Sequence, residues 1–186
     1  MVKHVFRLIF DFEQEEVWLN KMAEKGWMAE SFFAGVYRFS KEIPGEYTYR
    51  IELLPHFAWS AKNRPYLKFV EETNVDLVYT WVKWAVYRKK TSEGEFDVYT
   101  DINSRILHYR RVSRFLLLFV CLQWGIALYC GCLVVHALVM SPTDFTYLYG
   151  VLYFLFATLV GTLIFRAMCF ARKKYKLLKK EETFFE

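Results

Sequence analysis

Two apolar stretches near the C-terminus decide the fold: FLLLFVCLQWGIALYCGCLVVHALVM, Phe115 to Met140, and FTYLYGVLYFLFATLVGTLIF, Phe145 to Phe165. Neither stretch contains Lys, Arg, Asp or Glu. A helix that crosses a bilayer needs about 20 apolar residues, and both stretches reach that length. Because only SPTD, residues 141–144, separates them, the sequence predicts a transmembrane hairpin, with helices over 115–140 and 145–165 joined by an extracytoplasmic turn.

Charge is divided unevenly along the chain. Residues 1–100 carry 14 Lys and Arg against 15 Asp and Glu, whereas residues 101–186 carry 11 against 5. The positive excess therefore belongs to the membrane half. Since nucleic-acid binding needs a basic patch on the folded domain, the composition argues against nucleic acid as a partner.

The charges also predict an orientation in the cell membrane. The first residues, MVKHVFRLIFDFEQEE, lack the apolar core and cleavage site of a secretory signal, so we expect a cytoplasmic N-terminal domain. Cations flank both spans and are absent from residues 141–144, which by the positive-inside rule places both termini in the cytoplasm. We expect these flanking cations to contact anionic lipids. They are Arg110, Arg111 and Arg114 before the first span, and Arg172, Lys173 and Lys174 in the basic tail, 166–186.

Residues 1–100 show strand and helix patterns in alternation. Strands are predicted at 2–10, 27–39, 46–53 and 75–88, helices at 12–25 and 65–73, and a short edge strand at 96–99. This order is typical of the ferredoxin-like fold, βαββαβ, with both helices on one face of a four-stranded antiparallel sheet. We therefore predict an α+β domain of that type, with no internal repeat.

A linker helix is predicted between this domain and the first span. Asp101 can cap it, and no Gly or Pro interrupts residues 102–114. We expect one continuous helix from about Ile102 into the membrane, which would couple the domain stiffly to the bilayer.

Each span carries a pair of small residues four positions apart: Ala127 and Gly131 in the first, Ala157 and Gly161 in the second. Small residues let helix backbones approach closely in lipid. The pairs indicate packing of the hairpin on itself; packing against the helices of another protein is the alternative.

No pattern in the sequence indicates a catalytic, cofactor or metal site, and we predict none of the three. All four cysteines lie in or beside the spans, and the four histidines are scattered. The acidic cluster at 11–16 suits a helix N-terminus. His56, Phe57 and Trp59 lie in an irregular connection, and the pattern leaves open whether they meet the membrane interface or line a ligand cleft.

Several motifs resemble those of a bacterial family of membrane proteins, known as domain of unknown function 2812. The motifs are FDFEQEEVWLNKMAEKGW, YRF, PGEYTYRIELL, FVEETNVDLVYTWVKWAVYRKK and DINSRILHYRR, and they span Phe10 to about Arg111. The most specific is WLNKMAEKGW, Trp18 to Trp27. The resemblance implies an accessory membrane protein of Gram-positive bacteria, often encoded beside PadR-like transcriptional regulators. It implies no activity, and it favours a role in regulation or envelope stress.

The sequence therefore predicts a membrane-anchored cytoplasmic module that regulates or binds other proteins and has no catalytic activity. Its expected partners are membrane lipids together with another membrane or cytoplasmic protein, or further copies of itself. The alternative is an accessory subunit of a larger membrane complex such as a transporter. An enzyme is the third possibility, and a deep cleft lined by ionisable groups would favour it.

Overall fold

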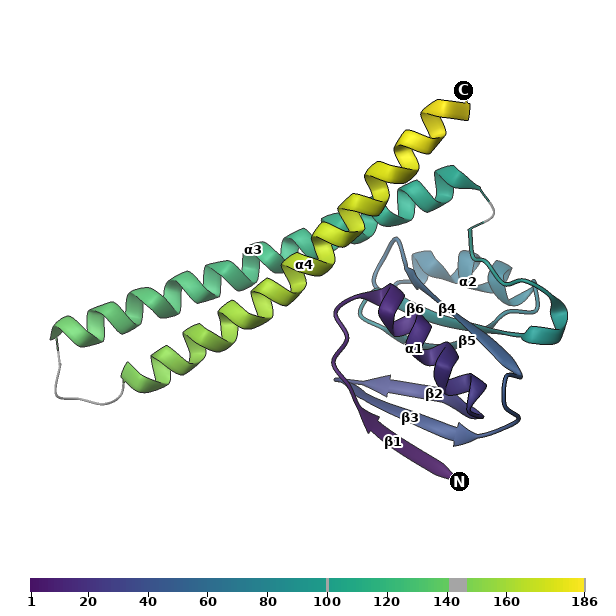
Figure 1. The fold of residues 1–186 in the computed structure, drawn as a ribbon, viewed down its shortest axis with the longest axis horizontal. Helices are drawn as coiled ribbons and strands as arrows, with labels where there is room; N and C mark the ends of the chain where they lie inside the picture. The colour runs from purple at the N-terminus through teal and green to yellow at the C-terminus, as the bar shows by residue number, and fades with distance from the viewer. Residues whose placement is uncertain (100, 141–146, 186) are drawn as a thin grey trace. The chain divides into compact units, whose positions relative to one another are not determined.

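The structure is a computed structural model that describes residues 1–99, 101–140 and 147–185. The chain divides into two compact units, Met1–Ser104 and Arg105–Glu186, called unit 1 and unit 2 below. Unit 1 mixes strands and helices, and unit 2 consists of two long helices (Figure 1). The predicted α+β domain followed by a pair of long apolar helices is therefore confirmed.

The described part of unit 1 contains six strands in two antiparallel sheets. Sheet A has the order β1-β3-β2, and sheet B has the order β4-β6-β5. The elements run in the order β1 (Val2–Phe6), α1 (Phe12–Glu24), β2 (Trp27–Phe33), β3 (Val36–Lys41), β4 (Tyr47–Leu53), η1 (Ala61–Asn63), α2 (Arg64–Glu71), β5 (Asp76–Trp81), β6 (Trp84–Lys90) and η2 (Thr91–Glu93).

The predicted ferredoxin-like order, βαββαβ around one four-stranded sheet, is not found. Each of two predicted strands, 27–39 and 75–88, is instead a hairpin of two strands. The first folds back at Ala34 and Gly35, with φ of 47° and 89°, and the second folds back beside Val82, with φ of 57°. Neither turn has the Asn-Gly or Asp-Gly sequence that marks a tight hairpin, so the sequence contained no clear signal for either turn.

Two further strand predictions were wrong. The strand predicted over 2–10 ends at Phe6 and lies at the edge of sheet A. Residues 96–99 form no edge strand. Phe96 is buried instead in the core of sheet B, so its apolar side chain indicated burial rather than strand pairing.

Unit 1 is built from one βαββ arrangement used twice, although no repeat was predicted. Both hairpins carry a register shift at the same place, between Ala29 and Ser31 in one and between Leu77 and Tyr79 in the other. The left-handed residue after each helix also recurs, as Gly26 with φ of 72° and Asn74 with φ of 60°. All of these pairs lie 48 residues apart, although few side chains are shared between the two copies.

Two hydrophobic cores hold the layers together. Leu19 of α1 is buried with Tyr37 of β3 and Ile51 of β4, so that α1 packs between the two sheets (Figure 1). Val70 of α2 is buried with Tyr87 of β6, so that α2 covers the other face of sheet B. The two sheets also meet directly, because β2 and β5 lie close together and Phe32 of β2 stacks on Tyr79 of β5 at a centroid distance of 6.0 Å. The outer face of sheet A carries exposed side chains.

Side chains of α1 also bind the free edge of β4. The Asn20 amide donates to the carbonyl of Tyr49 over 3.1 Å, and the Tyr49 N–H donates back to Asn20 Oδ1 over 2.8 Å. The Ile51 N–H donates to Glu16 Oε2 over 2.9 Å, and Arg50 pairs with the other oxygen of Glu16 over 3.1 Å. Helix and strand are therefore joined by hydrogen bonds as well as by apolar contact.

Unit 2 contains most of α3 (Ile102–Met140) and all of α4 (Tyr147–Phe185), each of 39 residues. The helix predicted to run from Ile102 into the first span is confirmed, since α3 is unbroken, and Asp101 accepts a hydrogen bond from the Ser104 N–H over 2.6 Å. The α4 helix continues through the predicted basic tail, 166–186, as far as Phe185. The predicted turn, 141–144, and residues 145–146 lie outside the described residues.

Candidate functional site

The facing surfaces of α3 and α4 contain the small residues that the sequence singled out. Ala127 and Ala157 are both buried, and the Gln123 amide of α3 donates to the carbonyl of Ala157 over 3.2 Å. A Cβ placed on Gly161 would lie 3.2 Å from Gln123 Cγ, and one on Gly131 would lie 3.4 Å from the ring of Phe154. Packing in this structure thus brings these four positions to the helix contact.

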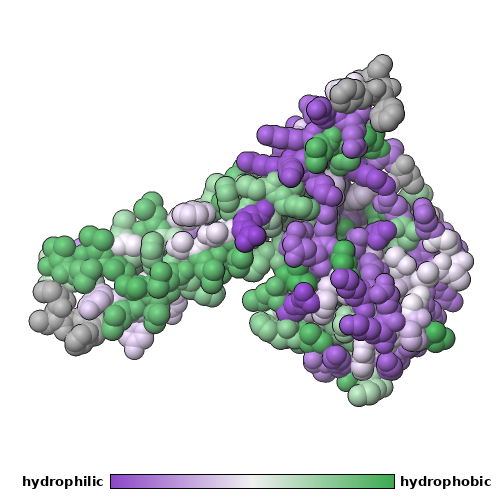
Figure 2. Space-filling view, viewed as in Figure 1, coloured by the Kyte–Doolittle hydropathy of each residue, from purple (hydrophilic) through white to green (hydrophobic). Residues whose placement is uncertain are grey.

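The remaining surface of the two helices is strongly apolar. Each contains a window of mean hydropathy 2.1 of which only 11% is buried. The core helix of a soluble protein would bury far more of such a window, so α3 and α4 are candidate membrane spans. Figure 2 shows this surface as a green region along the hairpin.

The predicted lipid-contacting cations lie on the same two helices, outside the apolar runs. Arg110, Arg111 and Arg114 lie on α3, and Arg172, Lys173 and Lys174 lie on α4. Arg111 and Lys174 are partly buried and the other four are exposed. Lys174 Nζ lies 5.5 Å from the ring centroid of Phe170, so its stem follows the helix surface. Their contact with lipid stays a prediction.

A carboxylate and tyrosine cluster lies between α1 and the two sheets. Burial raises the pKa of Glu15 to about 7, although a hydrogen bond from the Tyr37 hydroxyl acts in the opposite direction. Burial and the nearby Glu15 raise the pKa of Tyr37 and of Tyr79. The Tyr79 hydroxyl is buried without a hydrogen-bond partner among the described residues. Glu15 is therefore partly protonated near neutral pH.

A second cluster of this kind lies between β4 and α2. Glu52 is 2% exposed, and its Oε2 accepts hydrogen bonds from the hydroxyls of Tyr66 over 2.7 Å and Tyr87 over 3.4 Å. Burial and the Glu52 carboxylate raise the pKa of Tyr87. The sequence analysis predicted a strand over 46–53 but did not single out Glu52, so it missed this buried carboxylate. The surplus of tyrosines on the neighbouring elements was the one signal that could have found it.

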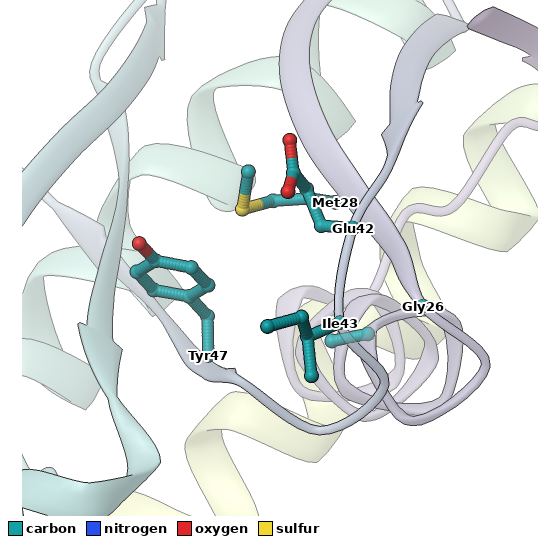
Figure 3. Close-up of a pocket in the computed structure, with 6 residues that line it drawn as sticks. Gly26, Met28, Glu42, Ile43 and Tyr47 are labelled. Atoms are coloured by element: carbon teal, nitrogen blue, oxygen red, sulfur yellow. The ribbon is translucent and has the colours of Figure 1, made fainter. Parts of the chain in front are cut away.

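Unit 1 also has a small depression at the end of the sheets where α1 ends, with a cavity volume of about 10 Å³. Figure 3 shows the side chains of Met28, Ile43 and Tyr47 around it. Its lining is mainly apolar, with Glu42 as the charged member. A typical small-molecule pocket measures roughly 300–1,000 Å³, so this depression is far smaller than one and has room for about one water molecule.

The described residues contain no candidate metal site. Across residues 1–99, 101–140 and 147–185, no three His, Cys, Asp or Glu side chains form a group that could hold a metal ion.

Phe57 and Trp59 are the aromatic residues whose role the sequence left open. Their rings stack with a centroid distance of 4.7 Å and an interplanar angle of 10°, and both side chains are exposed. They form an exposed aromatic pair on the surface of unit 1.

Comparison with known proteins identifies the family. No curated protein and no solved structure matches the chain. The family described as "Protein of unknown function (DUF2812)" matches residues 11–121, which include α1 and both hairpins of unit 1 and the first half of α3. This match covers more than half of the 186 residues, and it includes the Trp18 to Trp27 motif. The chain belongs to the DUF2812 family of proteins of unknown function.

Proposed function

We propose that the protein is a membrane-anchored regulatory module, with a cytoplasmic domain that binds a partner and a two-helix hairpin that holds it at the cell membrane. The observation that carries the proposal is the unbroken α3 helix, which starts at Ile102 within unit 1 and ends at Met140. The proposal assigns no catalytic activity to the domain.

The length of α3 supports this role. At about 1.5 Å per residue, 39 residues extend over roughly 58 Å, which is about twice the hydrocarbon thickness of a bilayer. The apolar run starts at Phe115, so residues 102–114 form a helical extension of about 20 Å on the side of unit 1. A helix bends far less than an extended linker, so binding to unit 1 can change the tilt or rotation of the span.

The proposed orientation has both termini in the cytoplasm. Four arginines precede the first apolar run, and seven cations follow the second. Lys and Arg near the ends of spans favour the cytoplasmic side. Unit 1 and the C-terminal part of α4 would then share one side of the membrane.

An accessory subunit of a larger membrane complex is the second candidate function. The specific observation in its favour is the large aromatic surface that α4 leaves exposed, which includes Tyr149, Tyr153 and Phe156. Lipid tails or the helices of a partner protein can cover such a surface. In that case the hairpin, rather than unit 1, would select the partner.

Purification in a mild detergent tests the two functions against each other. Three forms of the chain are purified: the unchanged chain, a variant with Gly-Pro inserted between Leu107 and His108, and the variant Tyr153→Ser on the exposed face of α4. If the protein is a regulatory module, a partner or a second copy should still be purified with the Tyr153→Ser variant. The distribution of distances between spin labels on unit 1 and α3 should broaden in the Gly-Pro variant. A stoichiometric membrane partner lost in Tyr153→Ser favours the subunit, and an unchanged distance distribution contradicts coupling through α3.

A further inference from the structure

One end of unit 1 carries large apolar side chains that the cores leave uncovered. It is the end at which both hairpins turn, and we call the exposed group the hairpin-tip surface. Its members are Phe6, Leu8, Phe33, Val36, Phe57 and Trp59, of which Phe33 and Trp59 are more than 70% exposed. Figure 2 shows apolar residues gathered towards the left-hand end of unit 1, where the β1 and β2 arrowheads of Figure 1 lie.

Strand register brings half of this surface into one row on sheet A. Val36 pairs with Phe6 of β1 on one side and with Phe33 of β2 on the other. Because directly paired residues project from the same face, the three side chains lie side by side on the outer face. The ring of Phe33 also meets that of Trp81 at a centroid distance of 5.3 Å, which places the ends of the two hairpins together.

The connection between β4 and α2 extends the surface beside the second hairpin. The Ala58 N–H donates to the carbonyl of Val82 over 2.8 Å, which fixes the loop against the β5–β6 turn. Phe57 and Trp59 on either side of Ala58 stack on each other, and Lys83 Nζ lies 5.9 Å from the ring centroid of Phe57. The aromatic pair is therefore held in place by backbone bonding and edged by a cation.

Cations outnumber acids in the loops around this end. The loops at the hairpin tips carry Arg7, Lys62 and Lys83 against one acid, Asp11, which caps α1. The loops at the opposite end carry Lys25 against five acids, Glu42, Glu46, Glu72, Glu93 and Glu95, but β3 and β6 also end there with Lys41, Lys89 and Lys90. Unit 1 is thus apolar and basic at the hairpin tips, whereas the charges at its other end largely balance.

We propose that the hairpin-tip surface binds the headgroup region of an anionic bilayer, as a lipid contact separate from the cations of α3 and α4. This inference rests on the proposed membrane anchoring. Trp and Phe favour the membrane interface, and nearby Lys and Arg are attracted to anionic lipid. Unit 1 ends at Ser104, and the apolar run begins at Phe115, about 16 Å along the helix, so a domain with a radius of roughly 13 Å can reach the surface.

The charges also argue against a second copy of the chain as the occupant. Two copies that met through this surface would bring Arg7, Lys62 and Lys83 of each against the same cations of the other. Like charges in such a contact oppose association, whereas an anionic bilayer neutralises all of them. The basic edge therefore favours lipid over self-association.

The test uses the full chain in nanodiscs that hold one chain each, with either zwitterionic or anionic lipid. Amide hydrogen exchange is followed in residues 31–37, 54–60 and 80–85 at the tips and in residues 42–46 at the far end. We expect exchange at the tips to slow at least tenfold in anionic discs alone, with no change at 42–46. Lys83→Glu and Trp59→Ser should each remove most of this protection, whereas Ile43→Ser, an exposed apolar control at the far end, should leave it unchanged.

The outcomes separate this inference from the proposed function. A chain that enters the disc and resists carbonate extraction, but shows no protection at the tips, overturns the lipid contact and leaves the anchoring intact. A chain that fails to enter discs at all overturns the anchoring itself. Equal protection in zwitterionic and anionic discs also overturns the anionic-lipid contact. Protection that appears only with two chains per disc overturns it too, and identifies a second copy of the chain as the occupant. Slow exchange in β3 and β6 of each variant shows that unit 1 remains folded.

Discussion

Replacing Glu15 by glutamine should stabilise unit 1 at neutral and alkaline pH. The carboxyl group of Glu15 lies in the interface between α1 and the sheets, where burial raises its pKa from 4.5 to about 7. Each pKa unit is worth about 1.4 kcal/mol, so ionising this group in the folded protein costs roughly 3 kcal/mol. Glutamine has the same shape and carries no charge, so Glu15→Gln removes that cost.

The sign of the pH dependence follows from proton uptake. Below pH 4.5, Glu15 is protonated in the folded and unfolded chains, and its ionisation costs nothing. Between pH 4.5 and about 7, the folded state binds more protons than the unfolded state, so the free energy of unfolding falls as the pH rises. Above pH 7 the loss is complete. Glu15→Gln should therefore gain up to about 3 kcal/mol at pH 8 and close to nothing at pH 4.5.

Hydrogen exchange in β3 and β6 of the full chain measures this difference, because the slowest core amides report the free energy of opening. The matched control is Glu24→Gln, which removes an exposed carboxylate from the same helix. An equal gain in the control, or a gain in Glu15→Gln that is the same at pH 5 and pH 8, would refute the reasoning from burial.

Two further predictions concern packing and buried hydrogen bonds. Gly161→Leu should destabilise the hairpin by about 1–3 kcal/mol in thermal unfolding, because a Cβ at this position meets side chains of α3. The control Gly125→Leu should be nearly neutral, because a Cβ at Gly125 meets nothing within 4 Å. Tyr66→Phe should destabilise unit 1 by about 1–3 kcal/mol in the exchange assay, and by more than Tyr87→Phe, because its hydroxyl lies 2.7 Å rather than 3.4 Å from buried Glu52. Equal effects within either pair would contradict the corresponding geometry.

The features that the sequence predicted correctly depend on local chemistry. Asp11, in the acidic cluster expected at a helix N-terminus, caps α1 by accepting from the Glu13 N–H over 3.0 Å. The continuity of α3 from Ile102 followed from the lack of any helix breaker. Each of these inferences needs only a few neighbouring residues, so no knowledge of distant contacts was required.

The sheet arrangement and the buried carboxylates required information that the sequence pattern lacks. Ala34 and Val82 turn their hairpins with positive φ, although neither is a residue that favours this conformation. Glu52 alternates as a solvent-facing residue should, yet it is buried, and the hydroxyls of Tyr66 on α2 and Tyr87 on β6 donate to its carboxylate. Both cases were decided by tertiary packing rather than by local preference.

The side chain of Asn20 caps part of the free edge of sheet B by hydrogen bonding to the backbone of β4. An exposed edge strand offers a row of unpaired N–H and C=O groups to any extended segment nearby, and so can seed aggregation. The Asn20 amide donates to and accepts from Tyr49 as a neighbouring peptide group would, and its nitrogen also donates to the carbonyl of Glu16 over 2.9 Å. A newly made chain that has formed α1 but not yet docked it leaves this edge open, so strand addition to sheet B stays possible until the α1–β4 contact forms.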